Sequence, residues 1–334
     1  MEYSKILIRA TNWVGDAVMS LPALHSVRDR FPQAHIAILA KPWVADLYSR
    51  EGLANEVIPY TASSLIEKWR VARDLGARGF DCALLLQNAF EAAALAWLAR
   101  IPNRIGYARD GRAWLLTRSV RVPKPGEIPP HQRFYYLELL RRAGIIDGLP
   151  DTVPSIGRGG LHSLSHSQPI IGVSPGAAYG TAKRWLPERF AEASLRLAKE
   201  RGASIALFGS KTESALCQDV AQLIEGVSVT NYAGQTTLAE FIDLASRCEL
   251  FLTNDSGAMH IASALGVPTV AVFGATDDIA TGPSGANSRV VREPVECSPC
   301  LLRECPIDHR CMTRVSAGRV VEQSLELLAS HSRP

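Results

Sequence analysis

Hydrophobic and polar positions follow two alternating patterns along this chain. Short apolar runs of strand length recur throughout, and between them lie longer segments whose apolar residues repeat with a helical period of about 3.6 residues. This alternation is typical of parallel sheets joined by crossover helices. The predicted strands are residues 5–10, 35–40, 56–60, 81–87 and 103–108 in the first half and 169–175, 203–209, 227–233, 248–254 and 268–274 in the second.

The helices predicted between these strands complete two doubly wound halves. They cover residues 17–30, 63–75, 187–201, 211–225, 237–247 and 257–265. Between the halves, GRGGLHSLSHSQP at 157–169 has no periodicity and predicts a linker. We therefore predict domains at 1–160 and 168–334, with a final helix that could pack back on the N-terminal domain. Facing sheets of this kind predict a ligand cleft between the carboxyl ends of their strands.

Length and composition agree with a two-domain soluble enzyme. The 334 residues exceed the size of a usual single core, and 47% are hydrophobic and 21% charged. No apolar run reaches the roughly 18 residues of a membrane helix, and residues 1–8 lack the apolar core of a signal peptide. These features predict a cytoplasmic protein.

Positive charge is concentrated in the first half. Residues 1–165 hold 21 Lys and Arg against 15 Asp and Glu, whereas the remainder holds 15 against 18. The excess gathers at Arg100, Arg104, Arg109, Arg112, Arg118, Arg121 and Lys124. Such a field would attract a phosphorylated or membrane-surface substrate, although a plain solvated surface is the alternative. We expect no nucleic-acid partner.

A long polar connection opens the second half. The stretch VSPGAAYGTAKRWLPERF, at 173–190, leads from a buried strand to a helix that starts near Leu186 or Pro187. Such a connection usually takes about two to six residues, and longer ones are often functional. Small residues, adjacent cations and a helix start together predict an anion site, of which phosphate is the favoured occupant. Its candidate residues are Ser174, Gly176, Ala177, Ala178, Lys183 and Arg184. The alternative is a loop held by Trp185 packing, with solvated cations.

A second polar group follows a later strand of the same half. In TNDSGAMH, Asp255 and Ser256 come at the strand's carboxyl end, Gly257 leaves room for a ligand, and His260 lies one helical turn after Ser256. These positions favour a ligand site. Helix capping by Asp255 and Ser256 is the alternative, because both residue types are preferred caps.

The first strand-to-helix turn, RATNWVGDAV, offers a candidate general base. Asp16 lies where a carboxylate could accept a proton from a substrate hydroxyl, although it could also cap the helix. The sequence has no G-x-G-x-x-G, phosphate-loop or G-x-S-x-G motif. It also has no D-x-D pair, so we predict metal-independent chemistry in which Lys183, Arg184 and helix ends supply the positive charge.

Four cysteines cluster near the C-terminus. Cys297, Cys300, Cys305 and Cys311 are spaced C-x2-C-x4-C-x5-C. The cluster could hold a structural metal or pair as disulfides, and the spacing is not that of a standard zinc ribbon. We expect it to have no catalytic role.

Four segments together resemble a known family. WVGDAVMSLPAL, SPGAAYGTAKRWLPERFAE, LFGSKTE and TNDSGAMHIASALGVPTVAVFGATD are similar, in order and spacing, to the bacterial lipopolysaccharide heptosyltransferases of glycosyltransferase family nine. The resemblance spans nearly the whole chain. Trp13 and the loop before Pro187 are more similar to type II than to type I heptosyltransferases, although Leu186 is an insertion in the loop pattern. The cysteine cluster departs from the barest family pattern.

The resemblance implies a GT-B fold of two Rossmann-like domains and an inverting, metal-independent transfer with no cofactor. It implies an ADP-heptose donor on the C-terminal domain and, on the N-terminal domain, a lipid A–Kdo–heptose acceptor whose first heptose is extended at the inner membrane face. Asp16 would then be the base and Lys183 the diphosphate partner. The donor site would also include Asp255, Ser256, Gly257, His260 and, at the ribose, Glu213. For the acceptor we predict Asn12, Trp13, Arg104 and Arg109.

Two other functions remain open from the sequence. One is a different GT-B activity, such as a sugar-nucleotide epimerase or a transferase with another donor or acceptor, including a type I heptosyltransferase. The other is a non-catalytic module that binds a nucleotide sugar or glycolipid.

Overall fold

The computed structural model describes residues 2–157 and 168–331, and the chain divides into two compact units, Met1–Pro154 and Ser155–Pro334. The backbone N–H of Ile156 donates to the carbonyl of Ala264 (2.9 Å), so the chain joins the second unit at this point. Most of the predicted linker, residues 158–167, lies outside the described residues.

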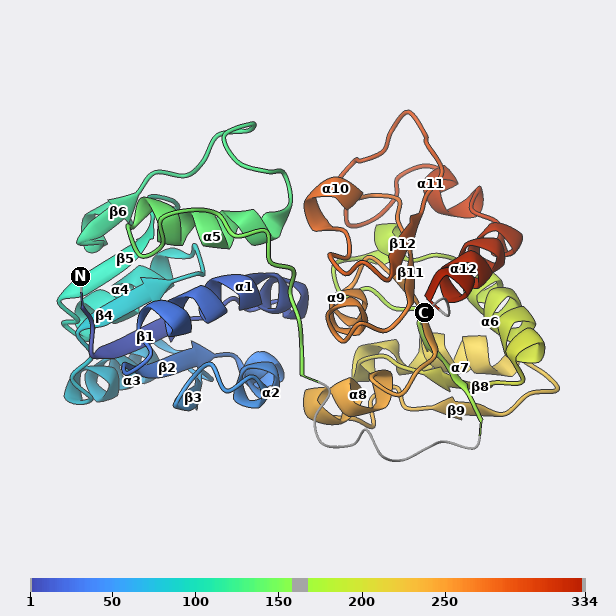
Figure 1. The fold of residues 1–334 in the computed structure, drawn as a ribbon, viewed down its shortest axis with the longest axis horizontal. Coiled ribbons are helices and arrows are strands. Elements are labelled where there is room, and N and C mark those ends of the chain that lie inside the picture. Colours follow the sequence, from blue (N-terminus) through green and yellow to red (C-terminus); the bar gives the residue numbers. More distant parts are fainter. Residues whose placement is uncertain (1, 158–167, 332–334) are drawn as a thin grey trace. The chain divides into compact units, whose positions relative to one another are not determined.

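The first unit is a parallel six-stranded sheet with the order β3-β2-β1-β4-β5-β6 (Figure 1). Helices α1, α2 and α5 pack together, as do α3 and α4. The strands are β1 (Lys5–Arg9), β2 (His35–Ala40), β3 (Glu56–Pro59), β4 (Cys82–Leu85), β5 (Asn103–Tyr107) and β6 (Arg118–Val120). The helices are α1 (Val14–Arg30), α2 (Pro42–Arg50), α3 (Leu65–Ala77), α4 (Phe90–Leu98), the 3-10 turn η1 (Ala113–Leu115) and α5 (Gln132–Arg142).

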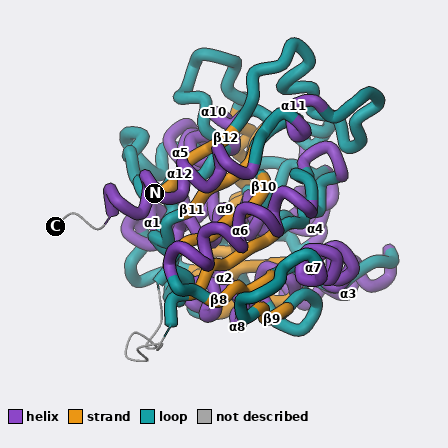
Figure 2. The backbone as a smooth tube through the Cα atoms, turned by 90° about the vertical axis from the view of Figure 1, so that its right-hand side faces the viewer, coloured by secondary structure: helices purple, strands orange, loops and turns teal. Residues whose placement is uncertain are grey.

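The second unit repeats this topology with the order β12-β11-β10-β7-β8-β9. Figure 2 shows its strands with helices around them. The strands are β7 (Ile170–Ser174), β8 (Ser204–Leu207), β9 (Val229–Asn231), β10 (Leu250–Asn254), β11 (Thr269–Val272) and β12 (Ser288–Val291). The helices are η3 (Thr181–Lys183), α6 (Pro187–Arg201), η4 (Lys211–Glu213), α7 (Ser214–Gln222), α8 (Leu238–Ala245), α9 (Gly257–Ala264), α10 (Asp278–Thr281), α11 (Arg310–Thr313) and α12 (Ala317–His331).

The central strands are apolar because helices cover both faces of each sheet. Ile6, Leu7 and Ile8 of β1 are all buried, as are Leu250, Phe251 and other residues of β10. Each sheet reverses its strand order once, between β1 and β4 and between β7 and β10. Ligands of doubly wound proteins bind outside the carboxyl ends of the strands at such a reversal. The predicted α/β, doubly wound fold is confirmed.

The final helix packs within the second unit. We allowed α12 to pack back on the N-terminal domain, but it packs on α6, β11 and β12 of the second unit. Its buried face includes Val320, Ser324 and Leu328, which alternate at helical spacing with exposed positions. This apolar face completes the core of the second unit, and a contact of α12 with the first domain stays a prediction. Across the described residues, we find no helix with the length and apolar content needed to span a membrane.

Candidate functional site

The predicted anion loop of the second unit runs from the end of β7 to the start of α6, and one buried side chain fixes both of its ends. The last residue of β10, Asn254, accepts a hydrogen bond at Oδ1 from the backbone N–H of Trp185 (2.9 Å). Its Nδ2 donates to the carbonyls of Pro175 (2.7 Å) and Gly176 (3.4 Å). Asn254 is fully buried, so the loop has a defined shape at the point where the strand order reverses.

Replacing Asn254 with alanine should therefore disrupt the loop conformation and destabilise the second unit. The change leaves one N–H and two carbonyls without this partner in the interior, and we expect about 2–4 kcal/mol less free energy of unfolding. Chemical denaturation measures this loss. The control, Asn287→Ala, removes a single long side-chain bond to the Gly266 carbonyl (3.5 Å) and should cost much less. Equal losses in the free energy of unfolding for the two variants would contradict the role of Asn254 in holding both loop ends.

Lys183 and Asp255 meet at this reversal. Lys183 Nζ lies 2.5 Å from Asp255 Oδ2, and Thr276 Oγ1 donates to the same oxygen, also at 2.5 Å. The Asp255 side chain is only 5% exposed and needs a cation nearby, because a lone buried carboxylate is costly. Lys183 Nζ also lies 4.7 Å from the centre of the Tyr179 ring. An ammonium has three protons to donate, and one is directed to Asp255.

The other loop residues surround this pair. The Arg184 Nη2 donates to the Ala177 carbonyl (3.3 Å), while its buried Nε has no hydrogen-bond partner. Ser174 and Ala177 are buried and Ala178 is exposed. Trp185 is buried, as the alternative required, but the two cations are not simply solvated, since Lys183 pairs with Asp255 and Arg184 donates to the loop.

Glu213 lies directly against the start of the loop. A Cβ built on Gly176 would come within 2.1 Å of Glu213 Oε1, so any side chain at position 176 would displace this carboxylate. The other carboxylate oxygen accepts bonds from the backbone N–H (2.8 Å) and hydroxyl (2.7 Å) of Ser210. The structure thus brings Glu213 to the predicted donor loop and fixes its orientation through the turn at η4.

Helix α9 begins beside the Lys183–Asp255 pair. Ser256 is its N-cap residue by backbone position, but no side chain caps the helix, and the Ser256 hydroxyl instead contacts the Thr253 hydroxyl (3.1 Å). The Asp255 carboxylate accepts hydrogen bonds from Lys183 and Thr276. The helix-capping alternative for these two side chains is therefore wrong. Gly257 starts the helix, and His260 is buried one turn later.

In the first unit, Asp16 lies in the first turn of α1 after β1. The N-cap position is Trp13, so the alternative that Asp16 caps the helix is wrong. The Tyr136 hydroxyl donates to Asp16 Oδ1 (2.9 Å) from α5. Tyr136 is buried, and burial together with the nearby Asp16 charge raises its pKa well above the usual value, so the phenol stays protonated. The carboxylate is half-buried and oriented by a neutral donor.

Two of the four predicted acceptor residues lie shortly before Asp16 in the sequence. Asn12 precedes α1, its Oδ1 accepts from Arg9 (3.2 Å), and its carbonyl accepts from the Trp43 indole (2.8 Å). Trp13 is 54% exposed at the start of α1. Both lie in the β1–α1 turn that leads to Asp16.

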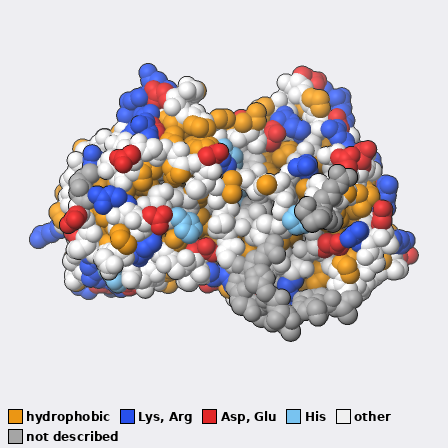
Figure 3. All heavy atoms as spheres, viewed as in Figure 1, with side chains coloured by type: hydrophobic (Ala, Val, Ile, Leu, Met, Phe, Trp, Pro, Cys, Tyr) orange, Lys and Arg blue, Asp and Glu red, His pale blue; other side chains and the backbone are white. Residues whose placement is uncertain are grey.

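Three arginines of the cationic region have different surroundings. The guanidinium of Arg104, near the amino end of β5, donates to the carbonyls of Leu115 (2.6 Å) and Ile101 (2.5 Å), and the structure does not bring it to Asp16. Arg112 is fully buried, and burial lowers its pKa to about 10. Arg109 is exposed at the carboxyl end of β5. On the face drawn in Figure 3, cationic and acidic side chains are interspersed.

The cysteine segment packs on the anion loop through its backbone. All seven cysteines are free thiols. Within 2–157 and 168–331, no three His, Cys, Asp or Glu side chains are grouped to hold a metal ion. A structural metal and disulfide pairing both stay predictions for this cluster. Instead, the Ala182 N–H donates to the Arg303 carbonyl (3.0 Å), the Tyr179 hydroxyl to the Leu301 carbonyl (2.7 Å), and a Cβ on Gly180 would lie 2.2 Å from the Arg303 oxygen.

Three residues of these sites were missed in the sequence. Asn254 is a polar residue inside an apolar strand, which is itself a signal of a structural role. Thr276 follows β11 at its carboxyl end, where the rule that identified Asp255 applies equally. Tyr136 carried no local signal, because only the packing of α5 on α1 brings it to Asp16.

Two doubly wound units with polar loops at their strand-order reversals define a GT-B glycosyltransferase fold. Residues 68–310 match the family model of glycosyltransferase family 9 (heptosyltransferase), which covers well over half of the chain. The chain therefore belongs to glycosyltransferase family 9 and is a glycosyltransferase.

The chain is similar to several type II heptosyltransferases. Lipopolysaccharide heptosyltransferase 2 of Salmonella typhimurium is 32% identical over 308 residues, which cover 86% of this chain and 88% of that protein. The protein of the same name from Escherichia coli is 33% identical with the same coverage. The solved structure of Escherichia coli ADP-heptose LPS heptosyltransferase II has a TM-score of 0.84 at 29% identity, and the match covers 98% of this chain and 100% of that one. The resemblance stated from the motifs is confirmed.

Proposed function

We propose that this enzyme transfers heptose from ADP-heptose to the first heptose of the lipopolysaccharide inner core, with inversion and without a metal ion. The names of its relatives support the substrate class, since they include lipopolysaccharide heptosyltransferase 2 and an ADP-heptose LPS heptosyltransferase. The observation that carries the proposal is the Lys183–Asp255 pair at the β7/β10 reversal, which holds an ammonium where a doubly wound unit binds its ligand.

On the donor side, the reaction needs positive charge at the departing diphosphate. Displacement at the anomeric carbon passes through an oxocarbenium-like state, and negative charge grows on ADP as the bond breaks. Lys183 and Arg184 meet this charge, together with the uncapped N-terminus of α9. Because these groups can supply the charge without a metal, and because the sequence has no D-x-D pair, we propose a metal-independent reaction.

The nucleotide end of the donor needs a different contact. Glu213 lies against Gly176 with Oε1 at the loop surface, and its other oxygen is held by Ser210. A carboxylate fixed in this way can accept hydrogen bonds from the ribose hydroxyls. Ser256, Gly257 and His260 complete the proposed donor residues on α9.

On the acceptor side, Asp16 is the proposed base. The hydrogen bond from Tyr136 orients the Asp16 carboxylate, which can take the proton of the attacking hydroxyl. Asn12, Trp13 and Arg109 are the proposed acceptor contacts. The acceptor is an anionic glycolipid, so the enzyme would work at the inner face of the membrane as a peripheral protein.

One experiment tests this function directly. The purified protein is incubated with ADP-heptose and a truncated lipid A core that carries one heptose, and the product is weighed by mass spectrometry. We expect a gain of one heptose, and NMR should show inversion at the anomeric carbon, with turnover retained in a chelator. Transfer only to a core without heptose would identify a type I activity, and no transfer from ADP-heptose would overturn the proposal.

A further inference from the structure

The tryptophans of this chain are distributed unevenly. The sequence holds six, and the one in the second unit, Trp185, is 1% exposed. The five in the first unit are each about half exposed or more. They are Trp13, Trp43, Trp69, Trp97 and Trp114. Tryptophan is mostly buried in folded proteins, so this many exposed indoles in one unit require an explanation.

Three of them lie on elements of the first unit that pack on one another. Leu65, Ile66 and Trp69 project from the exposed side of α3, Phe90, Trp97 and Leu98 from α4, and Trp114 from η1; we call these seven residues the tryptophan surface. Helices α3 and α4 pack together, and an ion pair between Lys68 and Glu91 joins their first turns. The Trp114 ring lies 6.3 Å from both the Phe90 and Trp97 rings. The apolar side chains of α4 and η1 are thus one continuous group.

Cations border this surface. Arg70 and Arg73 are exposed on α3, and the Arg73 guanidinium lies 5.4 Å from the centre of the Trp69 ring. Arg100 follows α4 and Arg109 precedes η1, both exposed. Asp74 and Asp110 offset part of this charge in loose pairs with Arg73 (3.6 Å) and Arg109 (3.8 Å). Residues 1–154 still carry 20 Lys and Arg against 15 Asp and Glu, whereas residues 155–334 carry 16 against 18.

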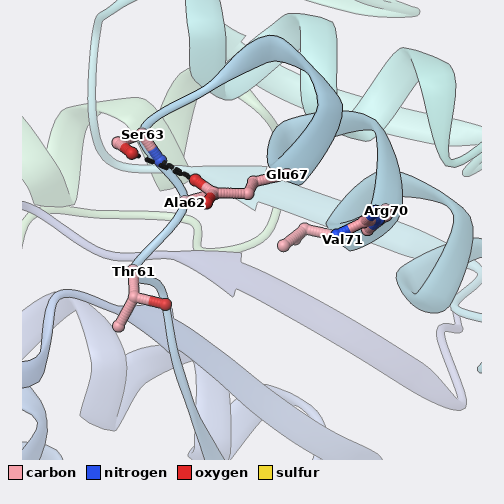
Figure 4. A pocket seen from close by; sticks show the side chains of 6 residues that line it. All are labelled: Thr61, Ala62, Ser63, Glu67, Arg70 and Val71. Carbon is pink, nitrogen blue, oxygen red and sulfur yellow. Dashed lines mark hydrogen bonds between the residues drawn. The ribbon is translucent and has the colours of Figure 1, made fainter.

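A recess of about 480 Å³ opens at the start of α3, lined by Thr61, Ala62, Ser63, Glu67, Arg70 and Val71 (Figure 4). Arg70 lines it, and the Glu67 carboxylate turns back on Ser63 and the helix start. Backbone hydrogen bonds at Ser63 and Ser64 lower the Glu67 pKa to about 2, so this acid serves as part of the helix cap. The recess thus presents the cation of Arg70 on α3, the helix that also carries Leu65, Ile66 and Trp69.

We propose that the tryptophan surface docks the enzyme on an anionic lipid bilayer, with the indoles at headgroup depth and the bordering arginines on lipid phosphates. Tryptophan and arginine side chains are common at membrane interfaces, because each has an apolar part that faces the lipid and a polar part that faces water or the headgroups. The exposed ring group of Phe90, Trp97 and Trp114 marks an interaction site, and the positive excess of this unit selects an anionic partner. The assignment rests on the proposed function, in which the acceptor is a membrane glycolipid.

Vesicle flotation of the whole protein tests this docking. We expect flotation with vesicles that contain phosphatidylglycerol, weaker flotation with phosphatidylcholine alone, and quenching of tryptophan fluorescence by brominated lipids. The double variant Trp97→Ser/Trp114→Ser should lose roughly tenfold in partitioning for each indole removed, since burying a large apolar side chain contributes one to two factors of ten. The matched control is Leu223→Ser/Ile279→Ser, which removes two exposed apolar residues of the second unit and should float like the parent.

The proposed function is measured separately on a soluble, deacylated acceptor. The double variant should transfer heptose to this acceptor at the parental rate and lose activity only on acceptor embedded in vesicles. If no protein floats, the docking is overturned whether or not the soluble acceptor is turned over. A concentration-dependent dimer in light scattering that the double variant abolishes, without vesicle binding, would overturn it in favour of an interface between copies.

Discussion

Replacing Asp16 with asparagine should lower the turnover of heptose transfer by about a hundredfold or more, while the affinity for the donor stays nearly unchanged. The amide has the shape of the carboxylate, and its oxygen can still accept the hydrogen bond from Tyr136, so the fold of the first turn of α1 is kept. What the variant loses is the ability to take a proton from the acceptor hydroxyl. Initial rates by mass spectrometry and ADP-heptose titration by calorimetry measure the two quantities.

Two controls separate a base from a structural residue. Asp29→Asn makes the same change at an exposed position in the last turn of the same helix, and it should leave turnover unchanged. Tyr136→Phe keeps the carboxylate and removes only its hydrogen-bond donor, so it should cost less than Asp16→Asn. Parental turnover in Asp16→Asn would remove the residue from the reaction. A protein that binds ADP-heptose and has no turnover in the parent form would instead be a binding module.

Replacing Lys183 with alanine should weaken ADP-heptose binding by about tenfold to a hundredfold, because charge-assisted hydrogen bonds contribute about 1.5–3 kcal/mol. Turnover should fall as well, since the same ammonium would face the charge that grows on ADP in the transition state. Calorimetric titration with ADP and with ADP-heptose measures the loss. Lys199→Ala, an exposed cation on α6, is the matched control and should bind as the parent does.

The alanine variant also leaves Asp255 buried without its cation, and this must be separated from the loss of a ligand contact. The double variant Lys183→Ala/Asp255→Asn removes the uncompensated charge while the Thr276 hydroxyl stays in place. If Lys183 acts on the diphosphate, the double variant should regain stability but not donor affinity. Recovery of affinity in the double variant would show that Lys183 acts only by neutralising Asp255.

Local pattern was enough to predict most of the framework. The apolar runs that became β1, β2, β7 and β10 are continuous because both faces of a parallel sheet are covered, and such runs stand out in a sequence. The short edge strands β6 and β12 were missed, since three or four residues at a sheet margin leave a weak apolar signal. The rule that ligands gather at strand carboxyl ends was enough to place Asp16, Lys183 and Asp255 in candidate sites from the order of residues alone.

The same rule could not assign roles to side chains. Arg104 and Arg112 look like surface cations in the sequence, yet both donate to backbone carbonyls, and Arg112 does so in the interior. In the sequence, an arginine that donates to buried carbonyls cannot be distinguished from one that faces solvent, because the residues next to each are similar. Only the course of the surrounding loops distinguishes them.

The sequence by itself determined the two doubly wound units, the long anion loop and the family, because periodicity, turn residues and motif spacing are local properties of the chain. The tertiary structure alone decided the partnerships. Asp16 and Tyr136 are 120 positions apart, Lys183 and Asp255 are 72 apart, and Asn254 reaches the loop ends from another strand. Such pairs form when sheets and helices pack, and no local pattern encodes which distant side chain will satisfy a buried polar group.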